Sequence, residues 1–596
     1  MSGVLEIPAF VIGLAGVTGA YDKVCLIWKT LAQAANYGDD VAQILTQVEM
    51  EYFRFEMWWS AMADLVKETK GSQQKARTAA PKGSLFALMQ ESMSSQFLGA
   101  VTQIQTGFEK IEQILKKNGS LATLNELAKN PPPPTSTGAL STPVERIRES
   151  RRRRARRLLK NTSFTRRVIH SAKPWGDADK NELEKEAQKL RSGNDQLYSI
   201  LPQRLRDVIL EQGISGYLLH DAPAATAVSS LGSTSAVTKT ANLVLLRGQT
   251  SQAAGHDRPA INVMAEEIRE ASNVRRISAS TPPLSGPVDT VWSSSHYTPP
   301  PTPLRPSATS RVLIEWYNYP ASAYLKAMER LARLSHLLRA EHKPTTLSTL
   351  PSRGVVHSSN IDAIGLIFSI PPTADPTKLP VSLHQLLEHK PPRPLPTLHQ
   401  RLHLASALSS TLYTFLLARW HHKRFISDSI VFLYELSRAG SLPDLARPYV
   451  AGFGLSRPED PQATSFPLTR ADKFEIYLHP ALAAAKAAGV TPLPKARAAF
   501  DVYSFGLVLV EIGFWIPLRK VVGDGGRNGD AETVRARVVD KCERDLACWA
   551  GERYRYVTLR CLRAEDMDAG GVGEELSDFF DVVVAELARC SEGSEV

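Results

Sequence analysis

The chain has few cysteines and lacks the motifs of the common catalytic classes. Its 596 residues include five cysteines, none in a CxxC pair or at the spacing of zinc ligands. This usage suggests neither a disulfide framework nor a metal site, and a reducing compartment is the simplest setting. A GxSxG nucleophile elbow and a P-loop are also missing, which argues against the enzymes that depend on them. We therefore expect no metal and no cofactor.

Long apolar runs are missing as well. The most apolar segment, Ile7 to Ala20, is shorter than the roughly 20 residues that span a bilayer. Glu6 precedes it where a secretory signal would carry basic residues, so a signal peptide is not expected. We expect a cytoplasmic protein in its resting state.

The net charge of +10 is unevenly distributed, with a cluster of basic residues between Arg146 and Lys160. The centre of this basic patch comprises Arg151, Arg152, Arg153, Arg154, Arg156 and Arg157. Such a run is attracted to phosphate-rich surfaces, either nucleic acid or anionic lipid headgroups. A solvated basic face or a nuclear-import signal would look the same, and no specific nucleic acid is indicated.

Composition divides the chain into three blocks. Residues 1–220 are mostly of helical character, with a disordered and basic tract around residues 129–165. Residues 221–308 are rich in Ala, Ser, Thr, Gly and Pro, a composition that buries too little apolar surface to fold and predicts a flexible linker. Compact hydrophobic periodicity returns over residues 309–590. The chain is therefore expected to be multidomain.

Helical periodicity dominates the first block. Apolar residues between positions 41 and 66 recur at three- and four-residue spacing, among them Val48, Tyr52 and Phe55. Further helices are expected over residues 84–115 and 179–201. The pattern predicts an all-α bundle and by itself says nothing about function.

Four features of this block resemble a known family. An apolar Gly/Ala-rich segment (Phe10 to Val17) is followed by a Glu- and Trp-containing helix (Glu51 to Trp58), then by Lys173 to Lys180 and Leu190 to Leu197. The arrangement is similar to the HeLo domain of fungal prion-forming incompatibility proteins. The resemblance implies a bundle whose N-terminal segment enters membranes on activation and causes cell death. The candidate membrane residues are Ile7, Phe10, Val11, Ile12, Leu14 and Val17.

The last block carries four segments in the order found in protein kinases. They resemble the catalytic loop (His422 to Ile430), the metal-binding DFG triplet (Gly452 to Gly454), the end of the activation segment (Tyr477 to Pro480) and the helix that supports the catalytic loop (Asp501 to Glu511). Each match is weak alone, but four in order are specific. The resemblance implies an α+β, bilobal kinase-like domain.

The residues that a kinase uses for chemistry are replaced. Phosphoryl transfer needs a carboxylate base, an Asp and an Asn for magnesium, and a lysine on the phosphates. The resemblance aligns Arg424 with the base, Ser429 with the metal-binding Asn, and Gly452 with the metal-binding Asp. Glu315, or with a shift Tyr317, stands where the lysine is expected. Losing these groups removes the main electrostatic stabilisation of the transition state.

The residues that remain are structural anchors in the kinases that this block resembles: His422, Phe453, Gly454 and Asp501. The pattern therefore predicts a pseudokinase, not an enzyme. One hypothesis is a fungal cell-death or incompatibility effector with a membrane-active bundle and a regulatory pseudokinase. It would self-associate, contact an anionic membrane on activation, and respond to a regulatory protein or an upstream kinase. The alternative is a non-lytic signalling scaffold that docks a partner and enters the nucleus through its arginine run.

Overall fold

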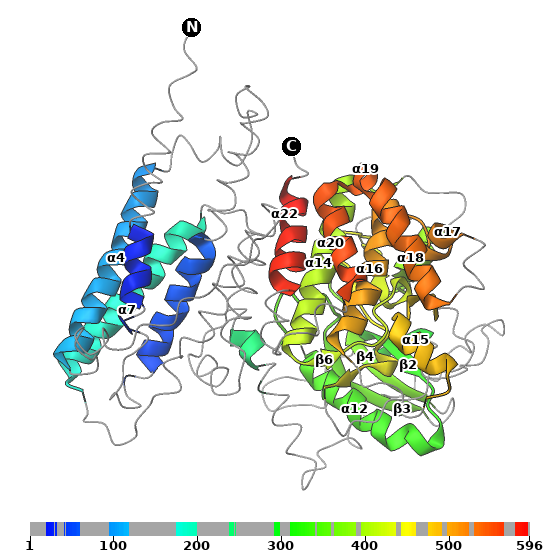
Figure 1. The fold of residues 1–596 in the computed structure, drawn as a ribbon. Helices are drawn as coiled ribbons and strands as arrows, with labels where there is room; N and C mark the ends of the chain where they lie inside the picture. The colour runs from blue at the N-terminus through cyan, green and yellow to red at the C-terminus, as the bar shows by residue number, and fades with distance from the viewer. Residues whose placement is uncertain are drawn as a thin grey trace. The chain divides into compact units, whose positions relative to one another are not determined.

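The structure is a computed structural model, and it falls into two compact units (Figure 1). The first, here called the helical unit, is formed chiefly by residues 1–241, and the second, the mixed unit, chiefly by residues 242–595. The residues that the structure describes are 20–28, 30–31, 41, 43–59, 94–118, 175–199, 238–242, 245, 291–297, 310–339, 343–358, 363–388, 395–436, 443–459, 475–490, 497–523, 530–564 and 579–593.

The described part of the helical unit is all α-helix, as its periodicity predicts. Residues 20–28 and 43–59 are helical, and two longer helices follow, α4 (Ser94–Lys117) and α7 (Asp177–Ser199). The apolar stripes of these helices are long enough to form a shared core, which drives the packing. Helices α4 and α7 run side by side although about 60 residues separate them in the sequence.

Aromatic side chains fill the centre of the helical unit. Trp28 stacks on Tyr52 with ring centroids 4.3 Å apart, and Phe108 of α4 meets the same two rings edge-on. Trp58 is fully buried and donates its indole N–H to the Leu197 carbonyl of α7 at 3.0 Å. A buried indole needs such a partner, so this bond joins the helix over residues 43–59 to α7.

Two glycines let α4 and α7 approach closely. A Cβ added at Gly107 would lie 2.7 Å from a Leu190 methyl carbon, and one at Gly193 would lie 2.8 Å from Ile104. Each glycine thus receives a large aliphatic residue of the opposite helix. Because close-packed interiors tolerate little added volume, a larger residue at either position would require the opposite side chain to shift.

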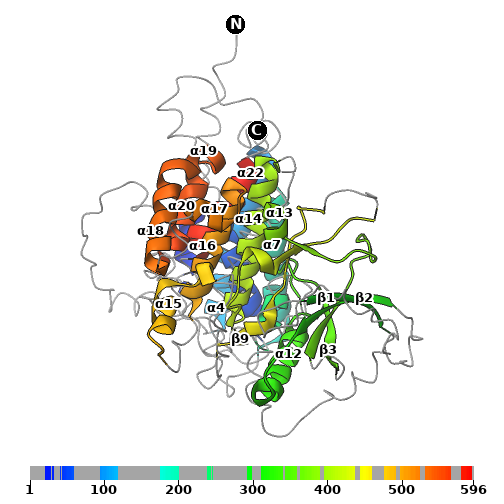
Figure 2. The ribbon, with the colours of Figure 1, turned by 90° about the vertical axis from the view of Figure 1, so that its right-hand side faces the viewer.

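The mixed unit begins with a four-stranded antiparallel sheet in the order β1-β2-β4-β3. Its strands are β1 (Val291–Tyr297), β2 (Ser310–Tyr317), β3 (Ser352–Ser358) and β4 (Ala363–Ser369). Helix α12 (Tyr324–Leu337), preceded by the short turn η3 (Ala321–Ala323), packs against β3. In Figure 2 the sheet and α12 form one end of this unit and most of its helices form the other.

Strand β1 corrects one expectation from the sequence. It lies within residues 221–308, predicted to be a flexible linker throughout, yet pairs with β2 along its whole length. Its Trp292 lies against Phe368 with ring centroids 6.0 Å apart, and the Trp316 indole donates to the Ser293 hydroxyl at 2.8 Å. The serine-rich composition of β1 gave no strand signal in the sequence, because the strand is held by its pairing with β2 and by one aromatic contact.

The sheet and α12 share an apolar core. One face of the sheet forms a cluster of Val312, Ile314, Trp316, Val356, Ala363 and Ile367. On α12 the apolar stripe is buried at Met328, Leu331 and Leu334, whereas Leu325 at its start is 81% exposed. The helix is thus amphipathic, and its buried face begins one turn after its start.

Two long helices organise the remainder of the mixed unit. Helix α14 (Leu398–Leu417) starts at a capping box between Thr397 and Gln400, and α16 (Ala498–Phe514) is buried over nearly its whole surface. A helix that is apolar on all sides belongs in a core; α14 and α16 contact each other, and α20 (Glu552–Leu562) and α22 (Ala585–Gly593) cover them.

Short elements complete the mixed unit. The strands are β5 (Val381–Ser382), β6 (Trp420–His421), β7 (Ile430–Phe432), β8 (Tyr449–Val450) and β9 (Arg457–Pro458). The helical elements are α13 (Leu383–Glu388), η4 (Ser427–Ser429), η5 (Phe453–Leu455), η6 (Glu475–Tyr477), α15 (Pro480–Ala487), α17 (Leu518–Val522), α18 (Ala531–Lys541), η8 (Cys542–Leu546), α19 (Ala547–Ala550) and η10 (Phe580–Val584). Strands β5, β7 and β8 form one small sheet, and β6 pairs with β9.

Candidate functional site

The segment Gly452 to Gly454 follows β8 and lies at the centre of the candidate site. Gly452 has a φ of +77°, in the left-handed region that favours glycine. A Cβ at this position would lie 2.4 Å from the Ser429 hydroxyl oxygen. The two positions that the kinase resemblance assigns to metal binding are therefore neighbours, and a side chain at the first of them would strain the backbone and require Ser429 to shift.

Side chains of strand β2 hold the backbone of this segment. The Gly452 N–H donates to Glu315 Oε1 at 2.6 Å, and the Phe453 N–H donates to Tyr317 Oη at 2.9 Å. Glu315 and Tyr317 are two residues apart, so they point to the same face of the sheet. Strand periodicity alone thus brings both groups to the segment.

Two further side chains bind the carbonyl of Gly454. Tyr319, just after β2, donates its hydroxyl to this oxygen at 2.7 Å, and Arg330 of α12 donates from Nη2 at 2.6 Å. We call Glu315, Tyr317, Tyr319 and Arg330, together with the segment that they bind, the loop clamp. Charge-assisted hydrogen bonds such as the one from Arg330 are the stronger kind, so the clamp ties the sheet and α12 to the segment after β8.

Burial sets the protonation of the clamp. Glu315 is fully buried, and this raises the pKa of its carboxyl to about 7 although Tyr317, the Gly452 N–H and Arg424 act to lower it. Among the described residues, its Oε2 atom has no hydrogen-bond partner. Burial likewise raises the pKa of Tyr319 to about 12. The clamp therefore has a carboxyl group that is partly protonated near neutral pH and tyrosines that stay neutral.

Asp501, near the start of α16, binds the loop after β6. Its carboxylate accepts the N–H of His422 at 2.8 Å and that of Lys423 at 2.7 Å. Lys423 has a φ of +64°, a conformation that is costly outside glycine. Burial raises the pKa of Asp501 to about 7. The two hydrogen bonds hold the loop in its strained conformation.

His422 links that loop to the clamp. Burial lowers the pKa of its ring to about 4, so the ring is neutral at physiological pH. Its Nδ1 accepts the Arg424 N–H at 3.3 Å, and its Nε2 lies 2.8 Å from the Ala451 carbonyl oxygen. A neutral ring can satisfy both contacts only as the tautomer that donates from Nε2. Phe453, fully buried, lies against this ring with centroids 5.1 Å apart.

Two positions that the kinase resemblance assigns to chemistry carry other groups. A cation, Arg424, stands at the position aligned with the catalytic base, and Gly452 presents no side chain at the position aligned with the metal carboxylate. The neighbouring carboxylate, Asp428, accepts a hydrogen bond from Ser382 Oγ at 3.2 Å. The described residues contain no cluster of three or more metal-ligating side chains. The site is arranged to hold two segments of chain together.

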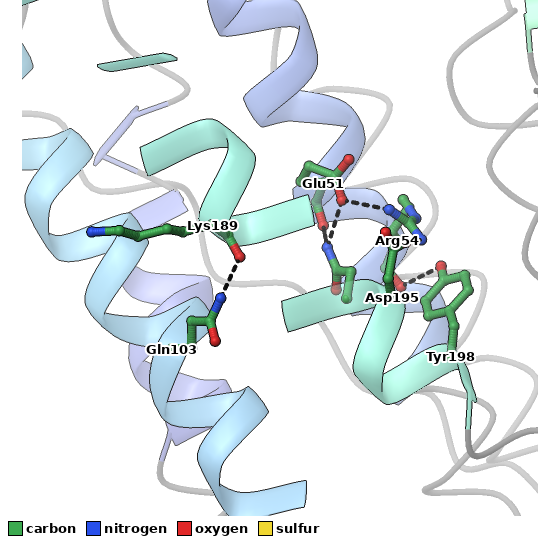
Figure 3. A network of polar contacts seen from close by, with 7 residues as sticks. Glu51, Arg54, Gln103, Lys189, Asp195 and Tyr198 are labelled. Atoms are coloured by element: carbon green, nitrogen blue, oxygen red, sulfur yellow. Dashed lines mark hydrogen bonds and ion pairs between the residues drawn. The ribbon is translucent and has the colours of Figure 1, made fainter. Parts of the chain in front are cut away.

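The helical unit contains a second buried polar network, drawn in Figure 3. Buried Glu51 accepts Asn194 Nδ2 at 2.8 Å and Arg54 Nη1 at 2.9 Å, while Arg54 also pairs with Asp195 at 2.5 Å. Tyr198 donates its hydroxyl to the Arg54 carbonyl at 3.0 Å. Burial raises the pKa of Glu51, and the Arg54 charge opposes this rise. The network fixes α7 against the helix over residues 43–59.

The structure locates some of the residues expected from the sequence but not others. Glu315, Tyr317, Ser429 and Gly452 meet at the clamp, and Asp501 contacts the loop that contains Arg424. The candidate membrane residues between positions 7 and 17 and the arginines at 151–157 lie outside the described residues. Within the described ranges, no helix is both long and apolar enough to cross a membrane.

Two clamp residues were missed by sequence reasoning. Tyr319 lies just past the end of β2 and Arg330 lies in α12, and neither belongs to the segments that resemble kinase motifs. The one available signal was an arginine on the buried face of that helix, where arginine is rare. Sequence alone could not show that its partner is a carbonyl group more than a hundred residues away.

Comparison with known proteins bears on the helical unit. Residues 9–217, just over a third of the chain, match the family model HeLo, described as prion-inhibition and propagation. This match confirms, for that part of the chain, the resemblance seen in the sequence. No curated protein matches the chain. The kinase resemblance of the mixed unit stays a prediction.

Proposed function

We propose that this chain is a fungal cell-death or heterokaryon-incompatibility effector. In this proposal the helical unit causes cell death and the mixed unit regulates that activity. The HeLo match over residues 9–217 carries the proposal, because that family is linked to prion inhibition and propagation. The buried networks of the helical unit support it further, since they stabilise a closed bundle that an activating signal would have to loosen.

The proposed activity is membrane disruption by the N-terminal segment. Residues 7–20 are apolar and rich in glycine and alanine, and the arginine run supplies positive charge for anionic lipid. A single short apolar segment binds membranes weakly. Self-association would bring several segments together, and we therefore propose that the active form is an oligomer.

The mixed unit is proposed to be a pseudokinase that restrains or triggers the helical unit. Three observations support this role. Arg424 replaces the base, a metal-binding carboxylate in place of Gly452 would require Ser429 to shift, and Asp501 retains the structural role of an anchor. Two compact units in one chain also suit a sensor joined to an effector.

Expression of the full chain in a fungal host tests the membrane proposal. Cells would express the wild type or the chain lacking residues 1–20, and viability and membrane association would be scored. A matched control is the substitution Leu26→Glu, which places a charge on a side chain that is already 64% exposed in the following helix. Loss of both readouts on deletion, but not in the control, supports the effector. A benign protein that accumulates in the nucleus would instead favour a signalling scaffold.

A separate assay tests the absence of catalysis. The purified chain would be incubated with ATP and magnesium, and both the thermal unfolding midpoint and the incorporation of phosphate into a generic acceptor would be measured. We expect no incorporation. Magnesium-dependent stabilisation by ATP together with phosphate incorporation would overturn the pseudokinase assignment and leave the role of the helical unit intact.

A further inference from the structure

The four-stranded sheet of the mixed unit has two edges that differ in character. Among the described strands, β1 pairs with β2 alone and β3 pairs with β4 alone, so β1 and β3 lie at the two ends of the sheet. An edge strand presents backbone N–H and C=O groups that can pair with a strand of another chain. Natural sheets usually protect such edges with charged residues, proline or a β-bulge.

Strand β3 has two of these protections. Its pairing with β4 changes register between Ser352 and Gly354, which interrupts the regular ladder. The residue between them, Arg353, is exposed and charged, and its Nε atom donates to the Ser369 hydroxyl at 2.6 Å. This edge is therefore poorly suited to pairing with a further strand.

Strand β1 has none of these protections. Its seven residues, VWSSSHY, include no proline and no Asp, Glu, Lys or Arg, and they pair with β2 in an unbroken register. The contact between Trp292 and Phe368 and the hydrogen bond from Trp316 to Ser293 hold this strand in the sheet. Ser294 at its centre is exposed. Strand β1 is therefore a regular edge that is already in the conformation needed to accept another strand.

We propose that β1 pairs antiparallel with β1 of a second copy of this chain, about a two-fold axis at Ser294. The strand sequence is self-complementary around this residue, because Ser293 would lie opposite Ser295, and Val291 opposite Tyr297. Pairs of hydroxyl residues and pairs of β-branched with aromatic residues stabilise antiparallel strands, and this register brings no like charges together. The sheets of the two copies would join into one continuous sheet.

Such a contact limits the assembly to two copies. A two-fold axis uses the same strand of both copies, so the dimer covers both β1 edges and leaves only the protected β3 edges at its ends. One strand pair is a small interface, and we therefore expect a weak dimer that depends on concentration. The argument uses no residue of the helical unit, so the dimer stands independently of the proposed membrane activity.

The test measures the mass of the purified full chain by sedimentation equilibrium over a range of concentrations. We expect a monomer–dimer equilibrium for the wild type. Ser294→Lys and Ser294→Glu each place two like charges opposite each other across the axis, so each should weaken the dimer at least fivefold. An equimolar mixture of the two variants should restore association, because lysine then lies opposite glutamate. Ser310→Lys adds the same charge at an exposed serine of β2 and is the matched control, expected to dimerise as the wild type does.

A cross-link gives a second readout of the register. In the proposed pairing Ser294 lies opposite Ser294 of the other copy, and facing Cα atoms of antiparallel strands are about 4.5–5.5 Å apart, within the range that a disulfide spans. Oxidised glutathione should therefore convert Ser294→Cys into a disulfide-linked dimer, with release of two molecules of reduced glutathione for each disulfide formed. The yield should exceed that of the wild type, whose Cys548 is exposed.

Three results would overturn the β1 dimer. The first is a wild type that stays monomeric at every concentration, as when another segment of the same chain covers β1. The second is association that neither charged variant weakens, because the copies would then meet through another surface. The third is a mixture of the two charged variants that associates no better than either alone. A dimer in which Ser294→Cys gives no more cross-link than the wild type would overturn the proposed register.

Discussion

The two units treat a buried carboxyl group in different ways. In the helical unit, Glu51 has a cation beside it, because Arg54 pairs with it and Asn194 donates a further hydrogen bond. In the mixed unit, Glu315 meets a backbone N–H and the hydroxyl of Tyr317, and burial raises the pKa of its carboxyl to about 7. The helical unit thus compensates the charge of Glu51 with a cation, whereas the Glu315 carboxyl of the mixed unit stays partly protonated near neutral pH.

This difference predicts how the stability of each unit responds to substitutions and to pH. A paired charge in a helical bundle contributes through its partner, so removal of the partner leaves a buried ion. A carboxyl group that holds the backbone of a loop contributes through geometry and proton binding, so it is sensitive to added volume and to pH. The following predictions use these differences.

The largest effect is expected for Gly452→Asp, which restores the metal carboxylate of a kinase. The new Cβ would lie 2.4 Å from Ser429 Oγ at a φ of +77°. We expect a loss of about 4 kcal/mol in unfolding free energy and no gain of phosphate transfer. Urea unfolding of the full chain measures the first and phosphate incorporation the second.

Gly489→Asp is the matched control for that substitution. Gly489 also has a positive φ of +67°, but nothing lies within 4 Å of its added Cβ. Backbone strain alone should cost about 1 kcal/mol. Equal losses in the two variants would contradict the close contact between Gly452 and Ser429.

In the helical unit, Arg54→Met should cost about 3 kcal/mol at pH 7. The change leaves Glu51 buried without its cation. The loss should shrink toward pH 4, where the carboxyl is protonated. Lys23→Met breaks an exposed pair with Glu109 and should change stability by no more than about 0.5 kcal/mol. A loss as small as this control would show that Arg54 does not stabilise the network.

Removal of a single hydroxyl from the clamp should have a smaller effect. Tyr317→Phe leaves the buried Phe453 N–H without its acceptor, and we expect a loss of about 2 kcal/mol in urea unfolding. Tyr449→Phe is the control, because Tyr449 is half-buried and donates no hydrogen bond to another described residue. The clamp would be contradicted if both variants kept wild-type stability.

The smallest effect is a pH dependence at Glu315. Because burial raises the pKa of Glu315 from 4.5 to about 7, the folded chain keeps a proton that the unfolded chain releases, and stability falls as pH rises through this range. Glu315→Gln keeps an acceptor for Gly452 but removes the titration. Relative to wild type, this variant should gain about 1 kcal/mol between pH 5 and pH 6. A difference that stays constant with pH would place the carboxyl pKa near its ordinary value.

Sequence reasoning recovered the fold of the helical unit because that fold depends on local periodicity. Helix α7 was expected over residues 179–201 and is found at Asp177–Ser199, and α4 (Ser94–Lys117) lies largely within the helix expected over residues 84–115. Strand β1 was missed because its serines carry no apolar alternation and its order comes from pairing with β2.

The candidate site was only partly predictable for a related reason. Motif order identified Glu315, Gly452 and Asp501 as positions of interest, because each lies within a recognisable segment. Tyr319 and Arg330 contribute through contacts with Gly454, more than a hundred residues away. Such contacts depend on tertiary packing and leave no local pattern in the sequence.

The central claim is that the activity of this chain belongs to the helical unit and that the mixed unit controls it. The most direct measurement compares the viability of fungal cells that express residues 1–241, residues 242–596 or the full chain. We predict death with residues 1–241, its loss on Val11→Glu within them, and survival with residues 242–596. Death of cells that express residues 242–596 would contradict the account. Survival of cells in which residues 1–241 accumulate to the level of the full chain would contradict it as well.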